Sequence, residues 1–144
     1  MRCFADTSFL LALLGTDSHS AAAERWVAKN PEPLITSDLV VIEAFNALRS
    51  LHLRGLVDEA EYKAGRLTLN TLLRRQALHR YSLRSRPLTA EAERLLDHFS
   101  PGLPHGTLDV LHVAAAKLLK SDSLASFDKN QRALAKETGL KAVP

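Results

Sequence analysis

The sequence has only one cysteine and no long apolar run. A single cysteine, Cys3, excludes an intramolecular disulfide and a cysteine-based zinc site. The apolar stretches, such as LVVIEAFNAL at residues 39–48, are interrupted by charge well short of the roughly 20 residues that a membrane span needs. No long apolar segment of the signal-peptide type follows Arg2. These absences predict a cytoplasmic protein without a membrane partner, in which Cys3 packs as a small apolar side chain.

Repeats, low-complexity tracts and Gly/Ser-rich linkers are also missing. The chain has 144 residues, of which 46% are hydrophobic, as in an ordinary globular protein. This length suits one domain with a single core. We therefore expect residues 1–144 to form a single domain.

The charge is small overall but unevenly distributed. The net charge is +3, yet the segment 49–86 holds nine Lys or Arg residues against three acids. A segment of this kind could face the phosphates of a nucleic acid. It could equally be the solvated face of ordinary helices, and charge alone does not decide between the two.

Short apolar runs alternate with helical patterns along the whole chain. Strands are predicted at residues 2–5, 33–36, 78–83, 123–127 and 140–143. Helices are predicted at residues 8–14, 21–30, 38–53, 60–75, 90–99, 108–120 and 128–137. Helix caps are predicted at Ser18 or Ser20, Ser37, Asp58, Thr89 and Thr107, and helix stops at Gly15, Gly55 and Gly139. This alternation predicts an α/β fold with a parallel sheet and helices on both of its faces.

Two acids directly follow predicted strands. Asp6 comes after RCFA, and Asp128 comes after SLASF. In parallel sheets, ligands bind beyond the carboxyl ends of the strands, which is where both carboxylates would lie. Each acid could instead cap the helix that follows it.

Two more acids lie inside apolar helical patterns. Glu43 interrupts LVVIEAFNAL and forms a polar stripe with Asn46 and Ser50. Asp109 stands near the start of TLDVLHVAAA. A buried carboxylate is costly unless it is paired or bound to a metal. The alternatives are a water-facing stripe for Glu43 and a favourable first-turn acid for Asp109.

Together these acids form an all-oxygen set of possible ligands, with no competing cluster of histidine and cysteine. Such a set selects Mg²⁺ or Mn²⁺ over zinc. These ions favour phosphoryl chemistry, because they polarise the phosphate and lower the pKa of a bound water.

The four acids and their flanking residues resemble the PIN-domain family, and within it the VapC-type toxins of bacterial toxin–antitoxin pairs. The matching segments are FADTSFLLAL around Asp6, ITSDLVVIEAFNAL around Glu43, TLDVLHVAAAKLL around Asp109, and LASFDKNQRALAKETGLKAVP around Asp128. They extend from residue 3 to residue 144, and the last segment is the most specific. Residues 55–100 match only in being helical and basic.

The resemblance implies a three-layer α/β/α sandwich with a short-stranded, mainly parallel central sheet. It also implies that the four acids are the catalytic, metal-binding quartet of a Mg²⁺- or Mn²⁺-dependent ribonuclease. Two accessory residues come with it: Ser126 in place of the family's usual threonine, and Asn46 one turn after Glu43. Thr7 is a third accessory residue, expected from its place beside Asp6. We expect Thr7 and Ser8 to orient Asp6 or a bound water. His105 stands where many members have a basic residue before the third acid.

The expected function is therefore that of an endoribonuclease and type II toxin, which hydrolyses RNA phosphodiester bonds with a metal-activated water. The resemblance further implies a cognate antitoxin protein and a homodimer as partners. The basic residues that could guide the RNA backbone are Arg49, Arg86, Lys117 and Lys129.

Other interpretations are weighed against this one. A catalytically degenerate domain that only binds RNA or protein would not need an intact acidic quartet. Aspartyl-phosphate chemistry usually needs a second acid two residues after the first, and that position is Ser8. His112, one turn after Asp109, is expected to be a packed, hydrogen-bonded histidine rather than a metal ligand. Trp26 and Phe45 are expected in the core rather than as base-stacking platforms.

Overall fold

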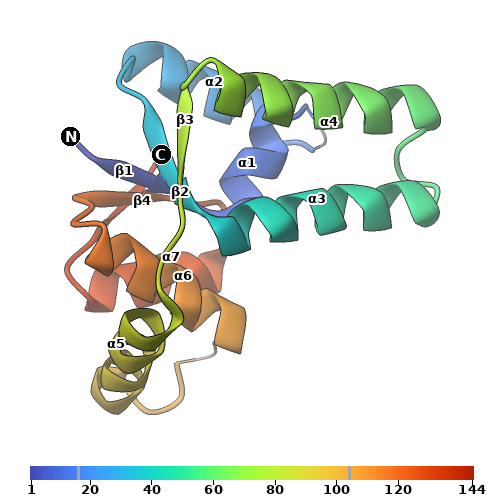
Figure 1. Ribbon diagram of the computed structural model, residues 1–144. Helices are drawn as coiled ribbons and strands as arrows, with labels where there is room; N and C mark the ends of the chain where they lie inside the picture. Colours follow the sequence, from blue (N-terminus) through green and yellow to red (C-terminus); the bar gives the residue numbers. More distant parts are fainter. Residues whose placement is uncertain (16, 104) are drawn as a thin grey trace.

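A single parallel sheet forms the centre of the molecule (Figure 1). The computed structural model describes residues 1–15, 17–103 and 105–144. The sheet contains β1 (Cys3–Ala5), β2 (Leu34–Ser37), β3 (Leu78–Tyr81), β4 (Ser123–Ala125) and β5 (Lys141–Val143). Its order is β3-β2-β1-β4-β5, and every neighbouring pair is parallel. The predicted α/β fold with a parallel sheet is confirmed.

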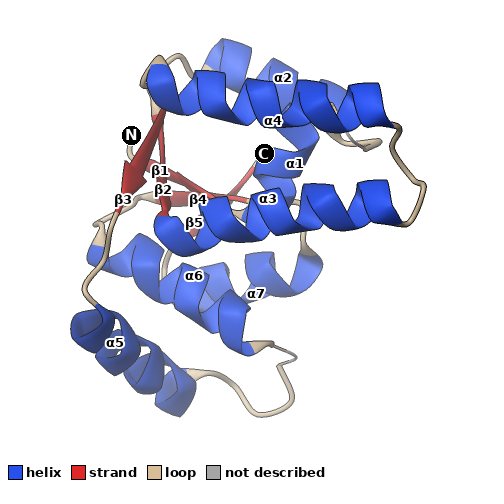
Figure 2. Ribbon diagram, turned by 45° about the vertical axis from the view of Figure 1, so that its right-hand side comes forward, coloured by secondary structure: helices blue, strands red, loops and turns tan. Residues whose placement is uncertain are grey.

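Helices cover both faces of this sheet (Figure 2). The helices in the described residues are α1 (Thr7–Leu13), α2 (Ser20–Lys29), α3 (Asp38–Leu53), α4 (Glu59–Arg74), α5 (Ser85–His98), α6 (Thr107–Leu118) and α7 (Lys129–Glu137). Helices α1 to α4 lie on one side and α5 to α7 on the other, which is the expected three-layer arrangement. Helices α3 and α4 form a hairpin that projects beyond the sheet.

The central strands are buried because helices cover both of their faces. Phe4 on β1 and Leu124 on β4 are fully buried, and Cys3 packs in the same core, as predicted. Trp26 and Phe45 are partly buried against this core, which confirms their expected packing role. Within the described residues, no helix has the length and apolar character needed to cross a membrane.

Helix α5 starts earlier than predicted. It begins at Ser85, so Thr89 lies inside the helix and does not cap it. The Thr89 hydroxyl donates to the Ser85 carbonyl at 3.0 Å. Pro87 lies in the first turn of this helix, where proline is tolerated because the backbone N–H groups lack helical partners.

Two other predicted N-caps are wrong. Helix α2 is preceded by His19 and begins at Ser20, whose hydroxyl donates to the Asp17 carbonyl. Helix α6 begins at Thr107, and its N-cap is Gly106. The caps at Ser37 and Asp58 and the stops at Gly15, Gly55 and Gly139 are confirmed, and these three glycines have φ angles of 76°, 70° and 81°.

Candidate active site at the carboxyl edge of the sheet

The order of the sheet brings the ends of β1 and β4 together at its centre. Ala5 pairs with Ala125, so both strands end at the same level. The next residue, Asp6, donates its backbone N–H to the Ala125 carbonyl at 3.1 Å. The first acid and the loop that leads to Asp128 are therefore neighbours at the carboxyl edge of the sheet.

Asp6 is a buried carboxylate held by several donors. It caps α1, and its Oδ1 accepts the Phe9 N–H at 2.9 Å and the Ser8 hydroxyl at 2.8 Å. Only 3% of the residue is exposed, and this burial raises its pKa to about 6. Hydrogen bonds from Ser126, Phe9 and Ser8 oppose that increase. The hydrogen bond from the Ser8 hydroxyl to Asp6 supports the prediction that Ser8 orients Asp6.

Ser8 also connects Asp6 to the β4 loop. Its hydroxyl accepts the Phe127 N–H at 2.9 Å and lies 3.2 Å from the Ser126 hydroxyl. Ser126 in turn accepts the Asp128 N–H at 3.0 Å. Ser126, expected as an accessory residue, therefore lies between the first and last acids.

Asp128 and Asp109 are each held by a backbone N–H at the start of a helix. Asp128 is exposed, and its Oδ1 accepts the Gln131 N–H at 2.8 Å. Asp109 is half-buried, and its Oδ2 accepts the Gly106 N–H at 3.0 Å. Gln131 joins the two helices, because its side-chain amide donates to the Asp109 carbonyl at 3.2 Å.

Glu43 is anchored from two other helices. Its Oε2 accepts the Thr7 hydroxyl of α1 and lies 2.6 Å from Nε2 of His112 on α6. Because a carboxylate only accepts, Nε2 of His112 carries the proton. The hydrogen bond from His112 is the main reason why the pKa of Glu43 is lowered. Thr7 was expected to orient Asp6 or a water, and in the structure it instead donates to Glu43.

His112 is a buried residue of α6, with only 2% of its surface exposed. Its Nδ1 is also buried and has no hydrogen-bond partner in the described chain. The expectation of a packed, hydrogen-bonded histidine is confirmed. Its partner, Glu43, could not be read from the sequence, because 69 residues separate the two.

Three of the four acids have one anchored and one open oxygen. For Glu43, Asp109 and Asp128, the second carboxylate oxygen accepts no hydrogen bond from the residues that the structure describes. Asp38, at the end of β2, differs. One of its oxygens accepts from the Arg80 guanidinium and the other from the Ser82 hydroxyl. Asp38 is therefore neutralised within the fold, whereas the three acids keep an oxygen available.

These residues fit an oxygen-bound divalent ion by their donor type. The open carboxylate oxygens are the ligands that Mg²⁺ and Mn²⁺ prefer. Within residues 1–15, 17–103 and 105–144, however, no three Asp, Glu, His or Cys side chains are close enough together to form a complete metal-binding group. The metal role of the quartet remains a prediction, and ion binding would require the side chains to turn toward one another.

Two further residues singled out in the sequence, Asn46 and His105, are exposed. Asn46 is exposed on α3 and makes no side-chain hydrogen bond to the described residues. His105 is exposed, and its ring Nδ1 donates to the Leu103 carbonyl at 2.7 Å. Neither residue contacts an acid of the quartet through a hydrogen bond within the described chain.

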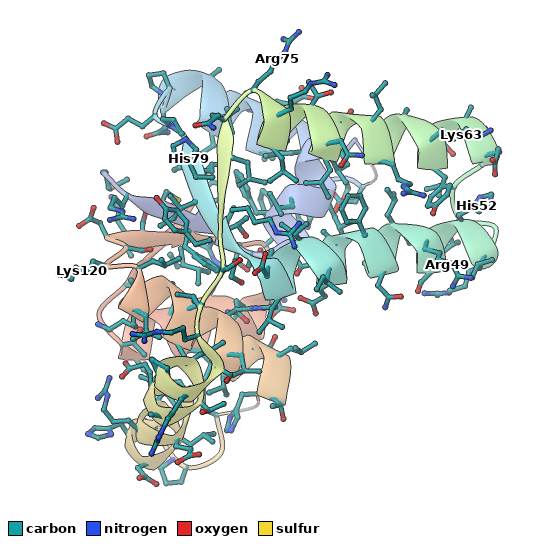
Figure 3. The ribbon with its side chains drawn as sticks, viewed as in Figure 1. Arg49, His52, Lys63, Arg75, His79 and Lys120 are labelled. Atoms are coloured by element: carbon teal, nitrogen blue, oxygen red, sulfur yellow. The ribbon has the colours of Figure 1, made fainter. Side chains whose placement is uncertain are left out.

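The predicted RNA-binding residues are dispersed. Lys129 follows Asp128 directly, and Arg86 is exposed in the first turn of α5. Arg49 lies toward the far end of the α3–α4 hairpin, on the side of α3 away from α4 (Figure 3). Lys117 is two turns after Asp109, about 12 Å along the helix, and its ammonium donates to the Thr138 carbonyl at 2.9 Å. The structure thus brings Lys129 to the acids but neither Arg49 nor Lys117.

Gln131 is a site residue that the sequence did not indicate. It is 1% exposed and contacts both Asp109 and Asp128. Nothing in its local sequence distinguishes it from a polar residue on a solvated helix face. Its role depends on how α6 and α7 pack together, which only the three-dimensional structure shows.

The fold and the carboxylate edge define a PIN domain. The chain belongs to the PIN domain family, whose profile matches residues 3–137. No curated protein sequence matches the chain.

Solved structures with a similar fold include VapC toxins. VapC20 of Mycobacterium tuberculosis, a sarcin–ricin loop cleaving toxin, is 19% identical, with a TM-score of 0.70 over 91% of this chain and 93% of that chain. VapBC2 of Rickettsia felis, bound to a promoter DNA fragment, is 14% identical, with a TM-score of 0.69 over 99% and 98%. PAE2754 of Pyrobaculum aerophilum is 22% identical, with a TM-score of 0.67 over 99% and 84%. The chain therefore has the fold of these proteins.

Proposed function

We propose that this PIN domain is a metal-dependent endoribonuclease and the toxin of a type II toxin–antitoxin pair. The observation that carries the proposal is the pattern of anchored acids at the carboxyl edge, three of them with an oxygen available to a cation. The contrast with Asp38, whose two oxygens are both occupied, supports the choice of these four acids.

In the proposed mechanism, Asp6, Glu43, Asp109 and Asp128 would hold Mg²⁺ or Mn²⁺. When bound, such an ion polarises the phosphate and lowers the pKa of water. Thr7 and His112 hold one oxygen of Glu43 in place, so the other would be available to the ion. Ser8, which donates to Asp6, lies beside Ser126, which accepts from the backbone of Asp128, so the two serines connect these acids. Lys129 lies beside Asp128, where it would attract the RNA backbone.

The proposed partners are an antitoxin protein and a second copy of the chain. VapBC2 was solved as a toxin–antitoxin pair, and this chain shares its fold over nearly its whole length. Exposed apolar side chains on the α3–α4 hairpin offer contact area to such partners; they are Ile42, Leu53, Leu56 and Leu67. We place the activity in the cytoplasm, within a single domain of residues 1–144.

The test is cleavage of single-stranded RNA by the purified protein with Mg²⁺, with Mn²⁺ and with a chelator. We expect cleavage only with the ions, and products with a 5′-phosphate and a 3′-hydroxyl. Asp6→Asn should abolish cleavage while the circular dichroism spectrum stays unchanged. Cleavage in the chelator, or equal rates for wild type and the variant, would refute the proposal.

A further inference from the structure

A series of aromatic rings extends from the core to the surface beside the acids. Phe9 contacts Trp26 edge-on, with ring centroids 5.6 Å apart. Phe9 also stacks on Phe127 at 5.7 Å, with 13° between the planes. Phe127 stacks in turn on His19 at 4.4 Å and 9°. Phe9 is fully buried and His19 is exposed, so the series ends in a ring at the surface.

The imidazole of His19 has one face against Phe127, and the residue is exposed. The two rings are nearly parallel, with 9° between their planes. The ring nitrogens of His19 make no hydrogen bond to the described residues. The backbone N–H of His19 donates to Asp17 Oδ1 at 2.8 Å. Although His19 precedes α2, its side chain caps nothing. The helix therefore gives no reason for this stacked position.

Phe127 supports this ring and connects it to the candidate site. It stands between Ser126 and Asp128, so its Cα lies about 3.8 Å from the Cα of Asp128. Its backbone N–H donates to Ser8 at 2.9 Å, and Ser8 in turn donates to Asp6. Phe127 is thus next to Asp128 in the chain and is connected to Asp6 through Ser8.

We propose that His19, supported by Phe127, is a stacking platform for an unpaired base of the RNA next to the bond that is cut. Single-stranded RNA is bound mainly by stacking of its bases on aromatic rings and histidine, which tolerates any base. The free ring nitrogens could also contact the edge of a base or a phosphate. The inference rests on the proposed function, since it assigns a substrate contact to the same site.

The test compares His19→Ala with His19→Phe in RNA cleavage. The alanine variant removes the platform, and we expect it to raise KM about tenfold, the effect of losing one stacked base, with kcat almost unchanged. The phenylalanine variant keeps a flat ring and should retain KM near the wild-type value. His98→Ala is the matched control, because His98 is an exposed histidine that bonds only its own helix, at the Arg94 carbonyl.

A substrate change separates stacking from a general effect on the fold. An abasic nucleotide is placed in turn at each position beside the cut. At one position the abasic nucleotide should raise the KM of the wild-type protein about tenfold but leave the KM of His19→Ala unchanged. The platform would be overturned if His19→Ala and His98→Ala had the same KM. It would also be overturned if the abasic nucleotide raised the KM of His19→Ala as much as that of wild type at every position.

Binding measurements distinguish failure of this inference from failure of the proposed function. Fluorescence anisotropy with a short labelled single-stranded RNA is recorded for Asp6→Asn, with and without His19→Ala. If wild type cuts RNA but His19→Ala changes neither binding nor KM, only the platform is wrong. If wild type cuts no RNA but binding still depends on His19, the platform stands and the nuclease proposal is wrong.

Discussion

Asp6 caps α1 and is also buried where ionisation is unfavourable. Its cap bonds to Phe9 and Ser8 stabilise the carboxylate, yet burial still raises its pKa to about 6. A cation would remove this conflict, because it stabilises the ionised form. The same residue is therefore a structural cap and the best-placed ligand of the proposed site.

Replacing Asp6 by Asn should stabilise the metal-free protein at pH 7 while removing activity. The native pKa of about 6 lies above the ordinary value of 3.8, so the native state binds the proton more tightly than the unfolded state. The contribution of Asp6 to wild-type stability should be fully present below pH 4 and be lost as the pH rises through about 6. The variant lacks this titration and can still cap the helix, so it should gain up to about 3 kcal/mol at pH 7.

Urea unfolding at several pH values in a chelator measures this effect. The variant and wild type should converge in stability as the pH approaches 4. A variant less stable than wild type at pH 7 would contradict the account of Asp6.

His112 should matter for metal affinity through Glu43. His112→Leu removes the donor to Glu43 Oε2, so we expect Mn²⁺ binding to weaken by roughly 10- to 100-fold, as for other residues that orient a ligand. His112→Gln retains an N–H donor and should lose much less. Calorimetric titration of Mn²⁺ into each protein gives the affinities, with His98→Leu as the control. Equal affinity in His112→Leu and wild type would show that Glu43 needs no such anchor.

At the scale of elements, the α3–α4 hairpin depends on one close contact. A Cβ on Gly65 would lie 2.9 Å from Cδ2 of Leu48, which is fully buried. Gly65→Val should therefore destabilise the protein by about 1–3 kcal/mol through overpacking. Ala64→Val, on the exposed side of the same turn, should change stability by only a few tenths of a kcal/mol. The free energy of unfolding in urea measures both, and equal values for the two variants would contradict this packing.

The elements show what local sequence can and cannot predict. Strands and helices followed from alternation and caps, because such signals act within a few residues. The start of α5 was predicted too late because Thr89 has the side chain of an N-cap, whereas its hydroxyl donates to the Ser85 carbonyl inside the helix. The four acids could be proposed from strand ends and a family resemblance. The contacts of Glu43 with Thr7 and His112, and the position of Gln131, could not, since they depend on how helices far apart in sequence pack.

At the scale of the whole molecule, the exposed apolar side chains of the α3–α4 hairpin predict self-association. Ile42 and Leu53 are 59% and 65% exposed, which is unusual for large apolar side chains. Light scattering over a concentration series should give about twice the 15.9 kDa of one chain. Leu53→Lys should shift the mass toward the single chain without changing the circular dichroism spectrum. A wild-type mass that stays at one chain throughout would remove the homodimer.

The central claim is that four particular carboxylates make a metal-dependent nuclease. The most direct measurement is the Mg²⁺-dependent rate of RNA cleavage for Asp6→Asn, Glu43→Gln, Asp109→Asn and Asp128→Asn, with Asp38→Asn as the matched control. Each of the four should lose at least about 100-fold in rate, whereas Asp38→Asn, whose carboxylate is occupied by Arg80 and Ser82, should stay close to wild type. Wild-type rates in any two of the four, or a loss confined to Asp38→Asn, would contradict the account.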